Sequence, residues 1–138
     1  MKIAVSACLL GENCKYNGGN NYSAKAADFV KGHEVIAVCP ETLGGLPVPR
    51  KKSEIVNGVV MREDGTPVDS EFRRGAAIAV RIIEEKGVGL VILQSRSPSC
   101  GSKTVYDGSF SGRLVNGKGI FAQMLAERGI RVIDVSDL

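Results

Sequence analysis

The sequence predicts a three-layer α/β domain of the Rossmann or flavodoxin type, with a mainly parallel sheet and a small inserted hairpin. Four short apolar segments rich in β-branched residues alternate with segments in which apolar residues recur at helical spacing. Strands that alternate with helices are joined by right-handed crossovers, which give a parallel sheet covered on both faces. The chain has 138 residues, the size of one domain, so residues 1–138 are treated as a single folding unit.

The beginning of the chain is predicted to contain a strand, a long loop and a helix. Residues Lys2–Ala7 are apolar and β-branched, and a stretch rich in glycine and asparagine follows at residues 11–21, so we expect a buried strand that ends at Cys8. Ser23–Lys31 carries alanines and a valine at helical spacing. Gly32 follows this segment and favours a helix end there.

The next segment is predicted to form a strand, a loop and a hairpin. Glu34–Val38 is the strand, and it ends at Cys39-Pro40 because proline cannot continue a central ladder. Residues 40–52 are rich in glycine, proline and basic residues and are expected to form a loop over the strand ends. Ser53–Arg62 contains Asn57-Gly58, a dipeptide that favours a type I′ turn, and this predicts a hairpin.

The second half of the chain is predicted to hold two helices and two strands. Thr66-Pro67 resembles a helix start with proline in the first helical position, and helical apolar spacing continues to Lys86. Val88–Leu93 is the third buried strand, and the glycine-rich residues 106–119 are expected to be irregular. The chain then closes with a helix and a strand, at Ile120–Arg128 and Ile130–Val135.

Composition and charge exclude several classes of function. Eighteen basic and fifteen acidic residues give a net charge of +3, and aromatic residues make up 5% with no tryptophan, which is atypical of a dedicated nucleic-acid binder. The longest apolar run, Val88–Leu93, is far shorter than the roughly 20 residues that cross a bilayer. Val5–Cys8 imitates a lipoprotein cleavage site without the apolar leader such a site needs, so we expect a cytoplasmic protein.

Three of the four cysteines lie at or just after predicted strand ends. Cys8, Cys39 and Cys100 follow the first three strands, whose carboxyl ends share the sheet edge where α/β proteins bind ligands. Three thiols suit zinc or an iron–sulfur cluster, although their spacing matches neither a zinc ribbon nor a bacterial ferredoxin. A cubane held by three cysteines would leave one iron open to a substrate. Cys14 as a fourth ligand would close that iron, and we expect Cys14 not to be a ligand.

Several motifs along the chain resemble those of a known family. They are Ser6-Ala7-Cys8-Leu9-Leu10-Gly11, Lys15-Tyr16-Asn17-Gly18-Gly19, Cys39-Pro40-Glu41, Gly44 to Arg50 and Ser95 to Gly101. Over essentially the whole chain they resemble the 2-thiouracil desulfidase-like proteins, a short bacterial and archaeal family. The resemblance implies a [4Fe–4S] cluster held by Cys8, Cys39 and Cys100, whose unligated iron takes the sulfur of a thiolated pyrimidine such as 2-thiouracil.

The resemblance also implies two catalytic residues, Glu41 and Ser97. Replacing sulfur by oxygen at a thiocarbonyl carbon requires water to attack and protons to move. Glu41 is expected to carry a proton, and Ser97 to orient water or substrate. Without the resemblance, a structural role is as typical of these residues as a catalytic one: Glu41 could be a helix cap or a solvated loop residue, and Ser97 a turn residue. The basic run Arg50-Lys51-Lys52 could steer an anionic ligand but is more typical of a solvated face.

The sequence therefore predicts an iron–sulfur desulfidase that acts on a small thiolated nucleobase, takes oxygen from water and releases sulfide. Two alternatives stay open. One is a cluster- or zinc-containing module that binds thiolated nucleosides or senses redox state without turnover. The other is a metal-free domain whose cysteines only pack in the core. The expected partner is a small thiolated nucleobase, with neither nucleic acid nor a membrane as partner.

Overall fold

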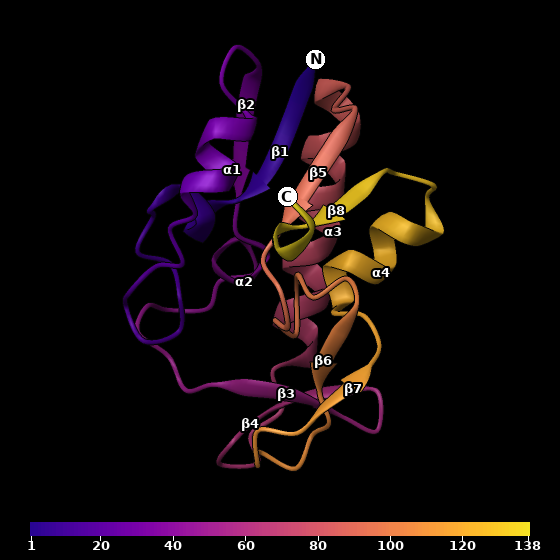
Figure 1. Cartoon of the computed structure of the whole chain (residues 1–138). Coiled ribbons are helices and arrows are strands. Elements are labelled where there is room, and N and C mark those ends of the chain that lie inside the picture. The colour runs from indigo at the N-terminus through magenta and orange to yellow at the C-terminus, as the bar shows by residue number, and fades with distance from the viewer.

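The computed structural model describes residues 1–138 and is built on a parallel sheet of four strands. The strand order is β2-β1-β5-β8, so the first strand lies in the interior beside β5 (Figure 1). All three pairings are parallel, and they bring Ser6 opposite Val38 and Leu93 opposite Asp134 at the carboxyl edge. The strands are β1 (Lys2–Ser6), β2 (Glu34–Val38), β5 (Leu90–Leu93) and β8 (Val132–Asp134). The predicted mainly parallel sheet is confirmed.

Helices pack on both faces of this sheet and give the three predicted layers (Figure 1). Ile3 and Val5 of β1 face one layer, formed by the short helix η1 (Ala7–Leu10) and by α1 (Ala24–Phe29). Ala4 points to the opposite layer and belongs to the larger core, which contains the apolar faces of α3 (Asp69–Lys86) and α4 (Ile120–Glu127). Because successive side chains of a strand point to opposite faces of the sheet, β1 contributes residues to two separate cores.

Two hairpins form a smaller part of the molecule beyond the carboxyl edge of the sheet (Figure 1). The predicted hairpin is β3 (Ser53–Val56) with β4 (Val59–Arg62), and positive φ angles of 50° and 81° at Asn57 and Gly58 agree with the type I′ turn. A second hairpin, β6 (Thr104–Tyr106) with β7 (Leu114–Asn116), runs through residues expected to be irregular. The pattern missed it because β7 is exposed on both faces and shows no apolar alternation.

The buried carboxylate of Glu54 joins the two hairpins. It accepts hydrogen bonds from the backbone N–H groups of Gly108, at 3.0 Å, and Phe110, at 3.1 Å. These donors lie in the connection between β6 and β7, while Glu54 lies on β3. The second hairpin is therefore held against the first by a polar contact, and the two together form one wall beside the sheet edge.

Two predicted element boundaries were wrong. Residues 40–52 were expected to be a loop, but Pro40–Leu43 form a helical turn, α2, with Pro40 in the first turn and Cys39 as N-cap. Proline is pre-organised for that position, and four residues are too few to show helical periodicity. The predicted helix start at Thr66-Pro67 was also wrong, because α3 begins at Asp69. Pro67 instead forms an isolated antiparallel bridge with Met61 of β4, so it extends the hairpin.

Helices α2 and α3 touch through their backbones at two glycines. A side chain on Gly75 would overlap the Pro40 carbonyl and would come within 2.7 Å of the Gly44 nitrogen. A side chain on Gly44 would overlap the Glu71 carbonyl. Both positions therefore require glycine for close approach, and this crossing fixes α2 over α3.

Alanine at position 75 is expected to separate this helix pair. Overpacking typically costs about 1–3 kcal/mol, so the Gly75→Ala variant should unfold at a lower temperature or denaturant concentration than the wild type. Gly117→Ala is the matched control, because its new methyl group would make an ordinary 3.4 Å contact with Val105. Thermal unfolding followed by circular dichroism checks this prediction, and equal midpoints for the two variants would contradict it.

Candidate active site

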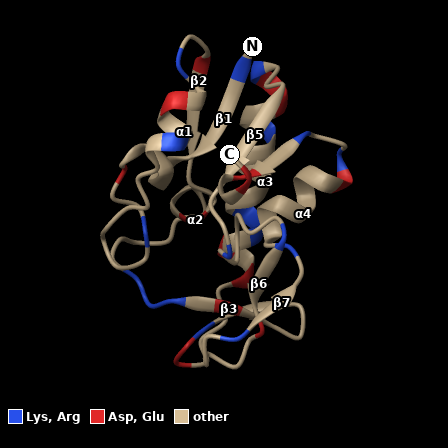
Figure 2. Cartoon of the chain, viewed as in Figure 1, with Lys and Arg blue, Asp and Glu red and all other residues tan.

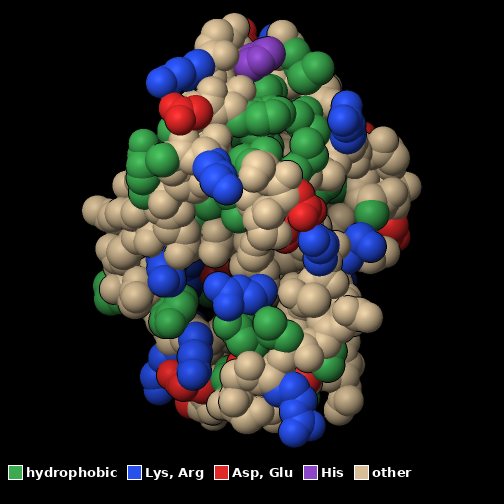
Figure 3. All heavy atoms as spheres, viewed as in Figure 1, with side chains coloured by type: hydrophobic (Ala, Val, Ile, Leu, Met, Phe, Trp, Pro, Cys, Tyr) green, Lys and Arg blue, Asp and Glu red, His purple; other side chains and the backbone are tan.

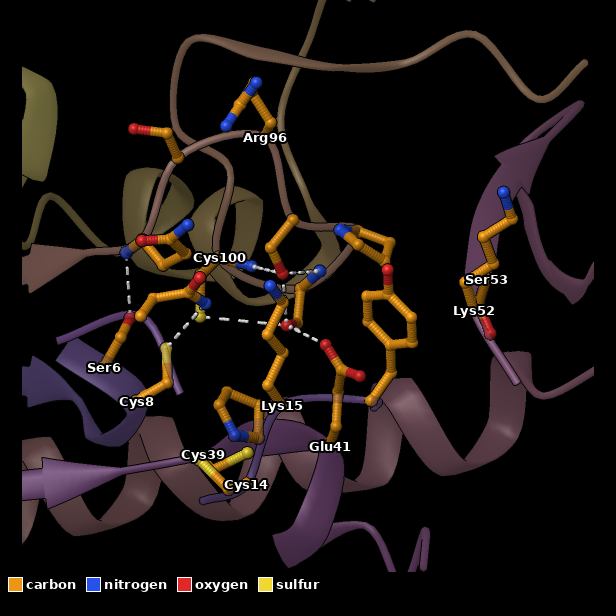
Figure 4. Close-up of a pocket in the computed structure, with 18 of the residues that line it drawn as sticks. Ser6, Cys8, Cys14, Lys15, Cys39, Glu41, Lys52, Ser53, Arg96 and Cys100 are labelled. Carbon is orange, nitrogen blue, oxygen red and sulfur yellow. Dashed lines mark hydrogen bonds between the residues drawn. The ribbon is translucent and has the colours of Figure 1, made fainter. Parts of the chain in front are cut away.

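A pocket of about 360 Å³ lies between the carboxyl edge of the sheet and the two hairpins (Figure 4). Its lining includes residues from both sides, such as Ser6 at the end of β1 and Ser53 at the start of β3. The structure brings all the predicted site residues to this one pocket: Cys8, Cys39, Glu41, Ser97 and Cys100. Cys14 lines it as well. A ligand site at the carboxyl ends of parallel strands is the arrangement expected for an open α/β sheet.

Cys8 and Cys39 are positioned by the short helices that follow their strands. Cys8 lies in η1, which starts directly after β1, and its sulfur accepts a 3.5 Å hydrogen bond from the Asn21 side-chain amide. Cys39 is the N-cap of α2, so it stands where β2 turns into that helix. Both thiols are partly exposed to the pocket. The two neighbouring strands thus present their sulfurs at the same edge.

Cys100 is held in a tight turn that is docked on helix α4. The Ser97 hydroxyl accepts hydrogen bonds from the backbone N–H groups of Ser99 and Cys100, both at 3.1 Å. The Pro98 and Ser99 carbonyls in turn accept from the first N–H groups of α4 at 2.9 Å. These carbonyls satisfy donors that a helix start leaves unpaired. In this turn Cys100 is only 4% exposed.

The four thiols differ in how readily they ionise. Hydrogen bonding with the neutral Cys14 thiol lowers the pKa of Cys8 to about 7 and that of Cys39 to about 6. The same hydrogen bonds raise the pKa of Cys14 above its usual value. Burial raises the pKa of the Cys100 thiol. Two accessible sulfurs therefore favour the thiolate form, which is the form that binds metal.

Glu41 is fixed in the pocket wall by an ion pair and a hydroxyl. Its Oε1 pairs with Arg50 Nη2 at 2.9 Å, and its Oε2 accepts from the Ser99 hydroxyl at 2.7 Å. Arg50 also donates to the Cys14 carbonyl at 2.8 Å, which ties the Cys14 loop to the same network. Both side chains are largely buried, at 15% exposure for Glu41 and 6% for Arg50. Charge-assisted bonds in such surroundings hold the carboxylate in one orientation.

Ser97 and Ser99 share one hydroxyl contact but have different neighbours. The two hydroxyl oxygens lie 2.9 Å apart. Ser99 makes the contact with Glu41, and its oxygen also lies 3.7 Å from the Cys100 sulfur. Ser97 therefore reaches Glu41 through Ser99. Sequence reasoning did not single out Ser99, and the only signal in the sequence was its position next to Cys100.

The basic run after α2 divides into one buried and two exposed residues. Arg50 turns inward to Glu41, which sequence reasoning did not anticipate. Lys51 and Lys52 are exposed and pair with Asp64 at 3.2 Å and Glu63 at 4.0 Å, and both also line the pocket. Lys15 and Arg96 also line the pocket. Figure 2 shows Lys and Arg residues on the segment that leads into β3 and on nearby loops. Figure 3 shows Lys and Arg side chains around a hollow in the same part of the surface.

The donor set of the pocket suits a thiophilic cluster. Cys8, Cys39 and Cys100 supply three soft sulfur donors from three different strand ends to one cavity. No group of three or more His, Cys, Asp or Glu side chains is arranged so that it could hold a single metal ion. A cubane places each ligand on a different iron, so its ligands need not meet at one point. Three soft thiols in one cavity therefore fit an iron–sulfur cluster.

The fold and the pocket together define a class of protein. The chain has an α/β fold with a thiol-lined pocket at the carboxyl edge of a parallel sheet. The model of the 2-thiouracil desulfurase family matches residues 3–137, and the chain belongs to this family. No helix is long and apolar enough to cross a membrane.

Two individual proteins extend this comparison. An uncharacterized protein of Bacillus subtilis (strain 168), YbbK, is 36% identical to this chain over an alignment of 146 residues, gaps included. The alignment covers 99% of this chain and 97% of that protein. The solved structure of the [4Fe-4S]-dependent thiouracil desulfidase TudS superposes with a TM-score of 0.92 at 37% identity. The match covers 99% of this chain and 92% of the solved one. The resemblance found in the sequence is thereby confirmed.

Proposed function

We propose that this protein is a cytoplasmic iron–sulfur desulfidase that replaces the thiocarbonyl sulfur of a 2-thiouracil-like base with oxygen from water. The observation that carries the proposal is the meeting of three cysteines with the Glu41–Ser99 pair in one pocket of a protein from the 2-thiouracil desulfurase family. All four cysteines are free, which suits a reducing compartment.

The residues that would hold the [4Fe–4S] cluster are Cys8, Cys39 and Cys100. Cys8 and Cys39 lie in the short helices that follow β1 and β2, and Cys100 lies in the turn docked on α4, so folded segments hold all three proposed donors. When bound through three cysteines only, the cluster would supply a Lewis-acidic iron for the substrate sulfur. Cys14 is left as a thiol beside Cys8 and Cys39 in this proposal.

The remaining chemistry is assigned to Glu41 and the two serines. The Glu41 carboxylate takes a proton from the attacking water, because it is the acceptor group that Arg50 and Ser99 hold at the pocket wall. Ser97 orients water or substrate. Its hydroxyl contacts the Ser99 hydroxyl, which in turn donates to Glu41, so the three residues form one hydrogen-bonded chain. One water is consumed, one C=S bond becomes C=O and one sulfide leaves. No electron enters or leaves this balance, so no reductant is needed stoichiometrically.

The test is an anaerobic turnover assay in isotopically labelled water. The protein is reconstituted with iron and sulfide and incubated with 2-thiouracil in water enriched in oxygen-18. We expect uracil that carries the label, together with an equal amount of sulfide. Uracil without label would contradict the use of water. Binding of thiolated bases without uracil, over a panel of them, would favour the binding module instead.

A further inference from the structure

Asp134 is a buried carboxylate that the proposed reaction does not use. It is the last residue of β8, at the carboxyl edge of the sheet, and it is only 4% exposed. Its four hydrogen-bond donors are three serine hydroxyls and one backbone N–H, from Ser95, Ser102 and Ser136. Burial opposes its ionisation, yet these donors hold the pKa of Asp134 below its usual value. A charge buried in this way needs its full set of donors.

The donors of Asp134 come from two different parts of the chain. Ser136 donates through its N–H and its hydroxyl, at 2.9 and 2.7 Å, and this caps the C-terminal turn η2 (Val135–Asp137). Ser95 donates to Oδ1 at 2.5 Å, and Ser102 to Oδ2 at 3.3 Å. Capping the turn uses Oδ1 alone. The second oxygen is therefore directed at the loop that follows β5.

Ser95 and Ser102 bracket the part of that loop that carries the site. Between them lie Ser97, Ser99 and Cys100, so Asp134 contacts the loop on both sides of the buried cysteine. From the other neighbour of β5 in the sheet, the Ser6 hydroxyl accepts the Gln94 N–H at 3.0 Å. The loop is thus tied to β1 at its start and to β8 at two points.

We propose that Asp134 is a positioning residue for the Cys100 loop. By accepting from Ser95 and Ser102 it closes the loop at both ends, and this keeps Cys100 buried and aimed at the pocket. The effect of this on cluster retention rests on the proposed function, whereas the effect on the position of Cys100 does not.

Alkylation of the cluster-free, reduced protein tests the position of Cys100 directly. Iodoacetamide labelling is followed by peptide mass spectrometry, with Cys14 of the same molecule as the reference. Asp134→Ala is expected to raise the labelling rate of Cys100, relative to Cys14, by about tenfold or more, because loss of hydrogen bonds to a charged group makes local opening easier. Ser136→Ala is the matched control and should leave the ratio near that of the wild type, since it removes only one hydroxyl donor from the C-terminal turn and leaves both loop contacts in place.

A second variant keeps the test decisive if Asp134→Ala does not fold. The double variant Ser95→Ala/Ser102→Ala leaves the carboxylate and its C-terminal partner in place and removes only the loop contacts. It should raise the Cys100 labelling ratio as Asp134→Ala does. A wild-type ratio in the double variant would overturn the proposal.

The reconstituted protein gives an independent reading. Loss of visible absorbance to an iron chelator is expected to be about tenfold faster in the double variant than in the wild type or Ser136→Ala. Equal rates would overturn a role of Asp134 in holding the cluster. If the wild type itself assembles no cluster, the proposed function fails, while the alkylation result still decides whether Asp134 positions Cys100.

Discussion

Serine in place of Cys8, Cys39 or Cys100 is expected to abolish nearly all the visible absorbance that the wild type gains on anaerobic reconstitution with iron and sulfide. A serine hydroxyl is a poor ligand for a soft metal centre. Loss of a residue that only hydrogen-bonds to a metal ligand typically costs about 10–100-fold in metal affinity, so loss of a ligand itself should cost more. Iron and acid-labile sulfide per chain, measured beside the absorbance, give the amount of cluster in each variant.

Cys14→Ser is the control for the three ligand variants. Cys14 lines the same pocket and its thiol contacts both Cys8 and Cys39, so the substitution is equally close to the metal site. We expect this variant to keep its cluster, because Cys14 is not among the proposed ligands. If Cys14→Ser loses as much visible absorbance as the other three variants, four thiolates bind the cluster. The proposal of an iron without a protein ligand would then be wrong.

Glutamine in place of Glu41 is expected to lower turnover of 2-thiouracil by about 10²–10⁴-fold while the cluster content stays at the wild-type level. The amide keeps the shape of the side chain and an oxygen that can accept from Arg50 or Ser99, but it does not take up a proton. The rate of uracil formation per bound cluster is the quantity to measure, because it separates loss of chemistry from loss of metal.

Two further variants make the Glu41 result specific. Glu127→Gln removes an exposed carboxylate at the end of α4 and should leave turnover unchanged. Ser99→Ala keeps Glu41 but removes its hydroxyl donor and its link to Ser97, so we expect an intermediate loss of rate. A wild-type rate in Glu41→Gln would remove this residue from the mechanism.

The sequence was sufficient for the parts of the fold that have a strong period or a fixed turn chemistry. The four sheet strands, α3 and α4, and the Asn57-Gly58 hairpin follow from apolar spacing and from residues that favour one backbone conformation. α2 and β7 were missed because a four-residue helix and an exposed three-residue strand leave no such pattern. The grouping of Cys8, Cys39 and Cys100 could also be predicted, because each follows a strand of the parallel sheet and the carboxyl ends of those strands share one edge.

The polar partners in the site could not be read from the sequence. Arg50 resembled its exposed neighbours Lys51 and Lys52, and only the folded chain shows that it turns inward to Glu41. The importance of Ser99 likewise depends on its contact, at 2.7 Å, with Glu41 of the distant helix α2. Local sequence does not determine which of several serines meets a distant carboxylate, because that contact is set by tertiary packing.

The origin of the three sulfurs in separate strand ends has a consequence for how the protein matures. The three sulfurs come together only after the chain has crossed from β1 to β2 and from β2 to β5, so an unfolded or half-folded chain presents scattered thiols with little selectivity for a cubane. Loading of the proposed cluster is therefore expected to follow chain folding. A group that binds only the finished fold also stabilises it by mass action, so the loaded protein should resist heat and proteases better than the cluster-free one. Iron supply would then govern the lifetime of the protein as well as its activity.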